Sequence, residues 1–163
     1  MNKNKNTTYL TQAAAIAALY VVLTLLANTL GLANYSIQVR FSEALTILPL
    51  FTPAAIPGLY VGCLLSNILT GCIFWDIIFG PIATLLGALG TYFLRKKSKW
   101  LAILPPIASN TLIVPFVLAF AYKFEGSLPY FMLTVGIGEI LSCGVLGLIL
   151  YSALYKYRKH IFE

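Results

Sequence analysis

The feature that most constrains this chain is its series of long apolar runs, which charged residues almost never interrupt. Charged residues make up 10% of the 163 residues and hydrophobic residues 60%, whereas an average soluble domain carries roughly 25% charged residues. Water could not solvate the outside of such a chain, but helices that face lipid satisfy their backbone hydrogen bonds internally. The sequence therefore predicts an all-α integral membrane protein with a single membrane domain over residues 1–163.

The apolar runs are numerous enough for a compact bundle of about six transmembrane helices. A helix crosses a hydrocarbon core of roughly 30 Å with about 20 residues, at about 1.5 Å per residue. The second run is short for a full span, so two crossings plus a re-entrant hairpin before Arg95 remain an alternative. The predicted spans are 8–30, 40–51, 54–70, 75–94, 100–122 and 128–157.

The basic residues indicate how the chain is oriented in the membrane. They fall in three short blocks, at residues 3–5, 95–99 and 156–159, and short loops rich in Lys and Arg stay in the cytoplasm. An even number of spans separates the blocks, so we expect a multi-pass protein of the cell membrane with both termini in the cytoplasm. The net charge of +6 does not indicate nucleic acid as a partner, because the blocks lack the interleaved aromatic residues of such a surface.

Polar side chains within the predicted spans collect toward the outer side of the membrane. Ionisable residues there cost roughly 2.5 to 3.5 kcal/mol each on insertion scales, so they normally face a partner or a water-filled cavity and mark function. One arginine and three acids in a shared cavity would favour a cationic or donor-rich ligand. The candidate ligand-binding residues are Arg40, Glu43, Asn67, Trp75, Asp76, Asn110 and Glu139.

Several of these candidates also have purely structural interpretations. Arg40 and Glu43 are three residues apart and could only neutralise each other at the interface. Asp76 could simply cap the helix that it opens. Glu139 is harder to explain in this way, because the small residues around it in GIGEILSCG let another backbone approach closely.

Aromatic residues near the same outer rim have two interpretations. They could stack on a flat ring of a ligand, or they could form the aromatic belt that is common at membrane interfaces. These residues are Tyr35, Phe74 and Trp75.

Motifs for other chemistries are mostly missing from the sequence. The sole histidine, His160, is in the basic tail, and there is no Walker glycine loop, HExxH motif or Cys/His cluster, so we expect no ATPase activity, metal or cofactor. No serine or cysteine stands beside a plausible base in the sequence. Three cysteines in or beside apolar runs indicate small packing residues: Cys63, Cys72 and Cys143.

The first apolar run carries a nearly flat surface of alanines. In TQAAAIAALYVVLT, the small-xxx-small pairs are Ala13 with Ala17 and Ala14 with Ala18. Such faces let helices approach closely enough in lipid for dispersion to hold them together. Packing inside the bundle explains the motif, and contact with a partner subunit is the alternative.

Three stretches of the chain match a known pattern: QVRFSEALTILPLFTPAAIPGLYVGCLLSN, WDIIFGPIATLLGALGTYFLR and GIGEILS. They resemble the QueT family, the substrate-binding S components of energy-coupling factor (ECF) transporters thought to import queuosine precursors. The resemblance implies a six-helix bundle with an outward-facing pocket that binds a deazaguanine from outside and hydrolyses nothing itself. Pro81 departs from the expected pattern, since a less rigid residue is expected there.

The resemblance also implies partners and residue roles. A membrane scaffold subunit and two ATPase subunits would power transport, with Ala14 and Ala18 as scaffold contacts. A carboxylate such as Glu43 or Glu139 would accept hydrogen bonds from the amide and amino donors of the ring. Arg40, Asn67 or Asn110 would donate to its carbonyl, Trp75 would stack on it, and Asp76 would pair with an aminomethyl substituent. The alternatives are an S component for a vitamin or another base, and a membrane enzyme or assembly factor.

Overall fold

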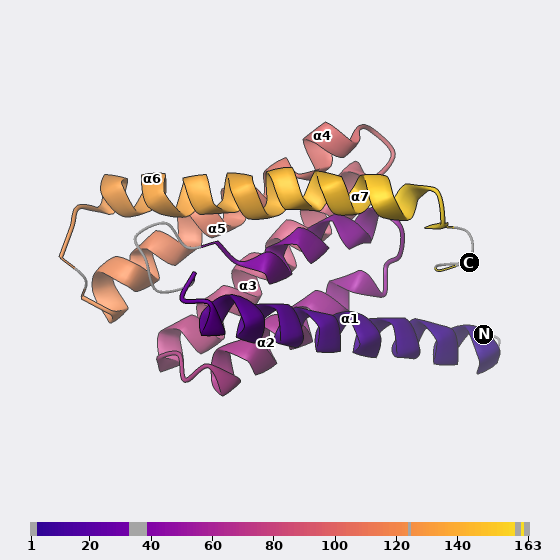
Figure 1. Cartoon of the computed structure of the whole chain (residues 1–163), viewed down its shortest axis with the longest axis horizontal. Helices are drawn as coiled ribbons and strands as arrows, with labels where there is room; N and C mark the ends of the chain where they lie inside the picture. The colour runs from indigo at the N-terminus through magenta and orange to yellow at the C-terminus, as the bar shows by residue number, and fades with distance from the viewer. Residues whose placement is uncertain (1–2, 33–38, 124, 159–160, 162–163) are drawn as a thin grey trace.

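The computed structural model describes residues 3–32, 39–123, 125–158 and 161, and every regular element within those ranges is helical (Figure 1). The predicted all-α fold class is confirmed. In chain order the elements are α1 (Lys3–Thr29), η1 (Phe41–Leu50), α2 (Ala55–Leu69), α3 (Phe74–Leu94), α4 (Lys99–Ala102), α5 (Leu104–Phe116), η2 (Val117–Ala121), α6 (Leu128–Glu139), η3 (Ile140–Leu146) and α7 (Gly147–Tyr155).

Four helical segments of the described chain are long and apolar enough to cross a membrane. The first is α1 and the second is α3. The third runs over Lys99–Ala121, where α4, α5 and η2 follow one another, and the fourth over Leu128–Tyr155, where α6, η3 and α7 do so. The helices η1 and α2 are apolar but shorter, so the chain forms six helical segments, four of them of membrane-spanning length.

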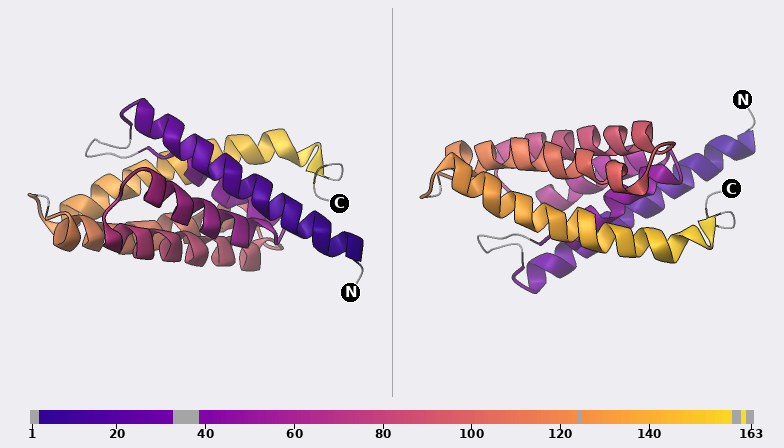
Figure 2. Two further views of the ribbon diagram at one scale, coloured as in Figure 1. Left: turned by 90° about the horizontal axis from the view of Figure 1, so that it is seen from below. Right: turned by 90° about the horizontal axis from the view of Figure 1, so that it is seen from above.

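The short helix η1 is enclosed by the other helices. It is a 3₁₀ helix of ten residues, which at about 2.0 Å per residue is shorter than a hydrocarbon core of roughly 30 Å. Figure 2 shows α1 and the α6–α7 segment on opposite faces of the bundle, and η1 contacts both α1 and α7. Eight of its ten residues, from Ser42 to Pro49, are buried. Its polar side chains can therefore lie at membrane depth without facing hydrocarbon.

Two glycines of α2 allow a close approach to α1. A Cβ atom added to Gly58 would lie 2.7 Å from the Ala13 carbonyl oxygen, and one added to Gly62 would lie 2.7 Å from the Tyr20 Cβ and 3.0 Å from the Ala17 carbonyl oxygen. The glycines are four residues apart and face alanines that are also four residues apart, which is the small-residue packing that holds membrane helices together. This packing fixes the α1 face that carries Tyr20 toward the interior.

The three basic blocks of the sequence lie at one end of the bundle. Helix α1 begins and α7 ends there (Figure 1), and the Gln12 side-chain amide donates to the Ile161 carbonyl at 3.3 Å. The connection from α3 to α4 is at the same end, since Arg95 lines one cavity together with Arg158. This placement agrees with an even number of spans between the blocks, and a cytoplasmic location for this end stays a prediction.

Irregular turns occur in two of the long segments, whereas α3 continues through its proline. Helix α3 includes Pro81 without ending, although proline removes one helical hydrogen bond. The third segment becomes π-helical after Phe116, and the fourth becomes π-helical directly after Glu139. π-Helical turns inside α-helices are frequent at functional sites. The turn after Glu139 therefore makes the surroundings of Glu139 a candidate functional site.

Candidate ligand-binding site

Glu43 is at the centre of a buried polar group inside the bundle. It lies in the first turn of η1 and is only 1% exposed. The Tyr20 hydroxyl of α1 donates to Glu43 Oε1, and the Asn110 side-chain amide of α5 donates to Glu43 Oε2 at 3.4 Å. Donors from two other helices thus satisfy both carboxylate oxygens, as a buried charged group requires.

Glu139 brings a second carboxylate to the same place from α6. It is 7% exposed, the Cys143 thiol donates to its Oε2 at 3.1 Å, and Asn110 also interacts with it. One ligand-type atom each from Glu43, Glu139 and Cys143 lie within 4.8 Å of one another. We call these three residues, together with Tyr20 and Asn110, the core group.

Hydrogen bonds between η1 and η3 hold the core group in place. The Thr46 hydroxyl donates to the Glu43 carbonyl at 2.6 Å and to the Cys143 sulfur at 3.4 Å. At the start of η1, the Arg40 backbone N–H donates to the Ser142 hydroxyl at 3.1 Å. The bond from Thr46 to Glu43 lies within η1, whereas the other two join positions about 100 residues apart in the chain. They position Glu43 opposite the face of the fourth segment that carries Glu139 and Cys143.

Arg40 is the cation associated with this region. It is half-buried and directly precedes η1, and its guanidinium group interacts electrostatically with both Glu43 and Asp76. Within the part of the chain that the structure describes, the core group therefore combines two close carboxylates with one neighbouring cation, Arg40. A ligand that offers hydrogen-bond donors or a positive charge would relieve the repulsion between the two acids.

The composition of the core group also raises the question of a metal ion. Carboxylate oxygens and a thiol sulfur within 4.8 Å are atoms that cations bind. Both Glu43 oxygens already accept hydrogen bonds, from Tyr20 and Asn110, and the Cys143 thiol donates to Glu139. This bonding suits a polar site for an organic ligand, so no step of the function proposed below depends on a metal.

Asn67 and Asp76 belong to a second polar group, at the end of the bundle opposite to the basic blocks. The Asn67 side-chain amide donates to the Asp76 backbone carbonyl at 3.0 Å, and the Tyr122 hydroxyl donates to Asp76 Oδ2 at 3.3 Å. The Ile73 backbone N–H donates to the Tyr122 oxygen at 3.4 Å. We call Asn67, Asp76 and Tyr122 the end group, because they join the end of α2, the start of α3 and the end of η2.

Asp76 acts on the start of α3 from within its first turn. The residue before the helix is Ile73, which has no side-chain cap, and Asp76 is the acidic residue of the first turn. A negative charge there interacts favourably with the helix dipole. The structural interpretation of Asp76 thus gains support, although Asp76 is not the capping residue itself.

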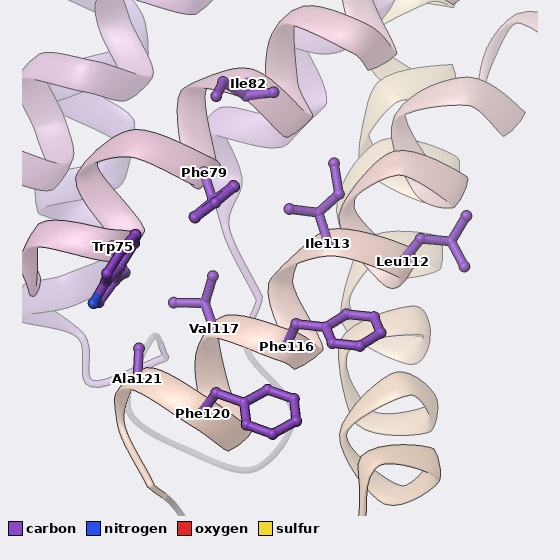
Figure 3. A pocket seen from close by; sticks show the side chains of 9 residues that line it. All are labelled: Trp75, Phe79, Ile82, Leu112, Ile113, Phe116, Val117, Phe120 and Ala121. Carbon is purple, nitrogen blue, oxygen red and sulfur yellow. The ribbon is translucent and has the colours of Figure 1, made fainter.

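Trp75 lies apart from both polar groups, in an apolar groove between α3 and the α5–η2 segment (Figure 3). It is 53% exposed and stacks on Phe79, with ring centroids 6.0 Å apart. This surrounding is typical of an interfacial aromatic residue. The groove has a volume of about 740 Å³ and is lined by Trp75, Phe79, Ile82, Leu112, Ile113, Phe116, Val117, Phe120 and Ala121.

The two alanine pairs of α1 face in different directions. Ala13 and Ala17 are 8% and 7% exposed, because they pack against the glycines of α2. Ala14 and Ala18 are exposed on the outside of the bundle. The internal-packing interpretation therefore accounts for the first pair, and the second pair remains a flat surface that a partner helix could approach.

The structure brings together only part of the predicted set. Glu43, Asn110 and Glu139 belong to the core group, and Arg40 interacts electrostatically with Asp76 of the end group and with Glu43. Asn67 and Asp76 are in the end group and Trp75 is in neither, as described above. Tyr35, suggested as a stacking residue, and His160 lie outside the described residues.

Sequence reasoning missed two members of the core group. Cys143 follows Glu139 by four residues, and this spacing places both on one helix face. The expectation about cysteines concerned neighbours in the sequence, and in space the Cys143 thiol contacts the Glu139 carboxylate. Tyr20 lies in a long apolar run, where its hydroxyl is the signal, because a buried phenol needs a hydrogen-bond partner.

A comparison with known protein families identifies the family of this helical bundle. A model of the QueT transporter family matches residues 10–156, which include most of α1 and all later helices. The chain belongs to the QueT transporter family. The resemblance seen in the sequence is thereby confirmed, and the core group lies entirely within the part of the chain that matches the QueT model.

A relative supports the same assignment. The chain is 32% identical over 146 residues to the queuosine precursor transporter QueT of Lactococcus lactis subsp. cremoris (strain MG1363), with 79% of this chain and 82% of the relative covered. No solved structure matches the chain. Membership in the QueT transporter family, together with the long apolar helices, makes this chain a multi-pass membrane protein of a transport system.

Proposed function

We propose that this chain is the substrate-binding S component of an ECF-type importer and that it binds a queuosine precursor, a deazaguanine, from outside the cell. The family and the name of the relative support transport of a queuosine precursor. The observation that carries the proposal for this chain is the core group, in which two carboxylates and an amide are buried together inside the bundle. Ionisable groups at membrane depth normally serve a substrate or ion pathway.

The chemistry of the core group suits the edge of a deazaguanine ring. That edge has amide and amino donors beside a carbonyl acceptor. Glu43 and Glu139 accept from the donors, and the Asn110 amide donates to the carbonyl, so one edge of the ring is recognised by three side chains from three helices. Hydrogen bonds to ionised acceptors are the strong ones, and they also reject rings that lack the donors.

Binding requires the bundle to open. Glu43 and Glu139 are 1% and 7% exposed, so a ligand reaches them only when neighbouring helices separate. The hydrogen bonds that join the η1 region to η3 run from Thr46 to Cys143, from the Arg40 backbone to Ser142 and from Cys143 to the Glu43 carbonyl, and a ligand could replace them with its own. The structure thus resembles a closed state of the site.

The partners in this proposal are a membrane scaffold subunit and two ATPase subunits, because the chain has no nucleotide-binding motif of its own. The exposed Ala14 and Ala18 surface of α1 is the proposed scaffold contact. Ala14→Leu with Ala18→Leu should abolish co-purification with the scaffold and leave folding unchanged. The matched control is Leu133→Trp, a bulky change at a lipid-exposed position of α6, which should keep co-purification. Equal recovery of the scaffold with the alanine variant would reject this contact.

The experiment that tests the ligand is thermal stabilisation of the detergent-purified chain by a panel of compounds. A ligand that binds only the folded state raises the melting temperature in proportion to its affinity and concentration. Deazaguanines should raise it, while guanine and vitamins should not. Stabilisation by a vitamin alone would keep the S component and reject the substrate. If no compound raises the melting temperature and neither scaffold nor ATPase subunits co-purify, the result would favour a membrane enzyme or assembly factor.

A further inference from the structure

A polar cavity lies at the end of the bundle that holds the basic blocks, and it shares no lining residue with the core group. Its volume is about 390 Å³, and its lining combines cations, phenols and the end of η1. The cations come from three places in the sequence: the end of α3, the start of α4 and the residues after α7. The lining residues are Leu50, Phe51, Arg95, Lys99, Tyr151, Tyr155 and Arg158.

The cations of this cavity are held in position by aromatic rings. Lys99 and Arg158 are only partly exposed. The Lys99 ammonium lies 5.3 Å from the centroid of the Tyr151 ring, and the Arg158 guanidinium lies 4.0 Å from that of Tyr155. Such cation–π contacts fix the direction of a long side chain. The charges are therefore arranged around the cavity before any ligand arrives.

A topological role alone does not explain this arrangement. Basic residues that only keep a loop in the cytoplasm need no particular geometry, and Lys96 and Lys97 of the same connection are exposed and do not line the cavity. Among the described residues, none that lines the cavity is acidic. Three formal positive charges thus converge on one concave site with two phenol groups.

We propose that this cavity binds a phosphate group, and its position favours the head group of an anionic phospholipid as the source. Arginine binds phosphate oxygens in a bidentate manner, lysine adds a point charge, and phenol hydroxyls donate hydrogen bonds. Trp100 and Tyr155 at the same end are 62% and 48% exposed, as is typical of aromatic residues at head-group level. Basic pockets between membrane helices bind anionic head groups. This inference does not rest on the proposed transport function.

The test compares lipids, ions and matched variants of the full chain in detergent. Thermal unfolding is followed with added phosphatidylglycerol, with phosphatidylcholine, and with inorganic phosphate against chloride at equal ionic strength. The test variant is Lys99→Gln with Arg158→Gln. The control variant, Lys96→Gln with Lys97→Gln, removes the same charge from the same end of the bundle but leaves the cavity lining intact.

Phosphatidylglycerol should raise the melting temperature of the wild type and of the control variant, whereas phosphatidylcholine should not. The test variant should bind phosphatidylglycerol at least about tenfold more weakly, since it loses two charge-assisted contacts to the phosphate that the control variant keeps. A shift with inorganic phosphate that the test variant loses would keep the site and assign it to free phosphate. Equal losses in both variants, or no shift with either phosphatidylglycerol or inorganic phosphate, would overturn the proposal.

A charge-preserving variant and a second measurement keep the test conclusive if the variant Lys99→Gln with Arg158→Gln fails to fold. Lys99→Arg with Arg158→Lys keeps the charges and should keep the lipid preference. Native mass spectrometry of the wild type should show one tightly held phosphatidylglycerol per chain in a mixture with phosphatidylcholine. A wild type that carries both lipids equally would contradict the proposed site whatever the variants do.

Discussion

The core group and the end group use the same residue types in two different ways. In each group a tyrosine hydroxyl donates a hydrogen bond to a buried acid. An asparagine side chain donates to that same acidic residue. In the end group the asparagine donates to the backbone of Asp76, and the acid lies in the first turn of a helix, where its charge is favourable. The end group is therefore complete without a ligand.

The core group differs because a second acid and a thiol converge on the first acid. Two carboxylates at such a distance repel each other, and donors on the protein only partly compensate for this. Sites that bind ligands are often less stable than they could be for this reason. The comparison teaches that a buried acid in this bundle indicates function when its surroundings leave charge unbalanced, and structure when they do not.

The largest effect is expected for Glu43→Gln. The change should weaken deazaguanine binding about 100-fold, because a charge-assisted hydrogen bond is worth about 1.5 to 3 kcal/mol. It should leave the melting temperature of the ligand-free chain unchanged or higher, since one of two repelling charges is removed. Ligand titration and thermal unfolding check the two parts. An affinity unchanged within about threefold would remove the distinction between the groups.

A smaller loss is expected for Asn110→Leu. The amide donates to Glu43 and also interacts with Glu139. Its loss therefore removes one neutral donor to the ligand and the contacts that stabilise the two acids. Deazaguanine affinity should fall about tenfold. The control is Leu112→Ala, an exposed position on the same helix, which should bind the ligand as the wild type does. A larger effect from the control would contradict the assignment.

For Asp76→Asn in the end group, we expect the protein to lose stability and to keep its ligand affinity. The free energy of unfolding should fall by about 1 to 2 kcal/mol, because the first-turn charge and its bond to Tyr122 are weakened. Affinity for a neutral deazaguanine should stay within about twofold. Selective loss of an aminomethyl-substituted compound would instead return Asp76 to the ligand site, as sequence reasoning suggested.

Tyr122→Phe should have the smallest effect. It removes one hydrogen bond to Asp76 and one to the Ile73 backbone and should lower the free energy of unfolding by about 1 kcal/mol. Tyr130→Phe, at an exposed tyrosine of α6, is the control and should cost little. If Tyr122→Phe weakened ligand binding without changing stability, the end group would not be a structural group.

The membrane character of the fold could be predicted from the sequence, because apolar runs must form helices in lipid to satisfy their backbone. The structure of segment 40–51 could not be predicted in the same way. Its length was known to be short for a span, but its 3₁₀ form and its burial among α1, α3, α7 and η3 depend on packing. No local pattern in the sequence specifies that packing.

The candidate site could be predicted in part for a similar reason. Counting residues along a helix gives the depth of Glu43, Asp76 and Glu139 in the membrane, but it does not give the direction in which each side chain points. Trp75 and Asp76 are neighbours in sequence, yet one faces an apolar groove and the other is 5% exposed. Helix rotation separates Trp75 from Asp76, and helix packing decides which acids meet in the core group; only the folded structure reveals either.

The most direct test of the core group is a calorimetric titration of the purified chain with a deazaguanine, comparing the wild type, Glu139→Gln and Asp76→Asn. The account predicts that the wild type and Asp76→Asn bind with affinities within about twofold of each other and that Glu139→Gln binds about 100-fold more weakly. Unchanged affinity in Glu139→Gln, with the loss instead in Asp76→Asn, would contradict the assignment of the ligand to the core group.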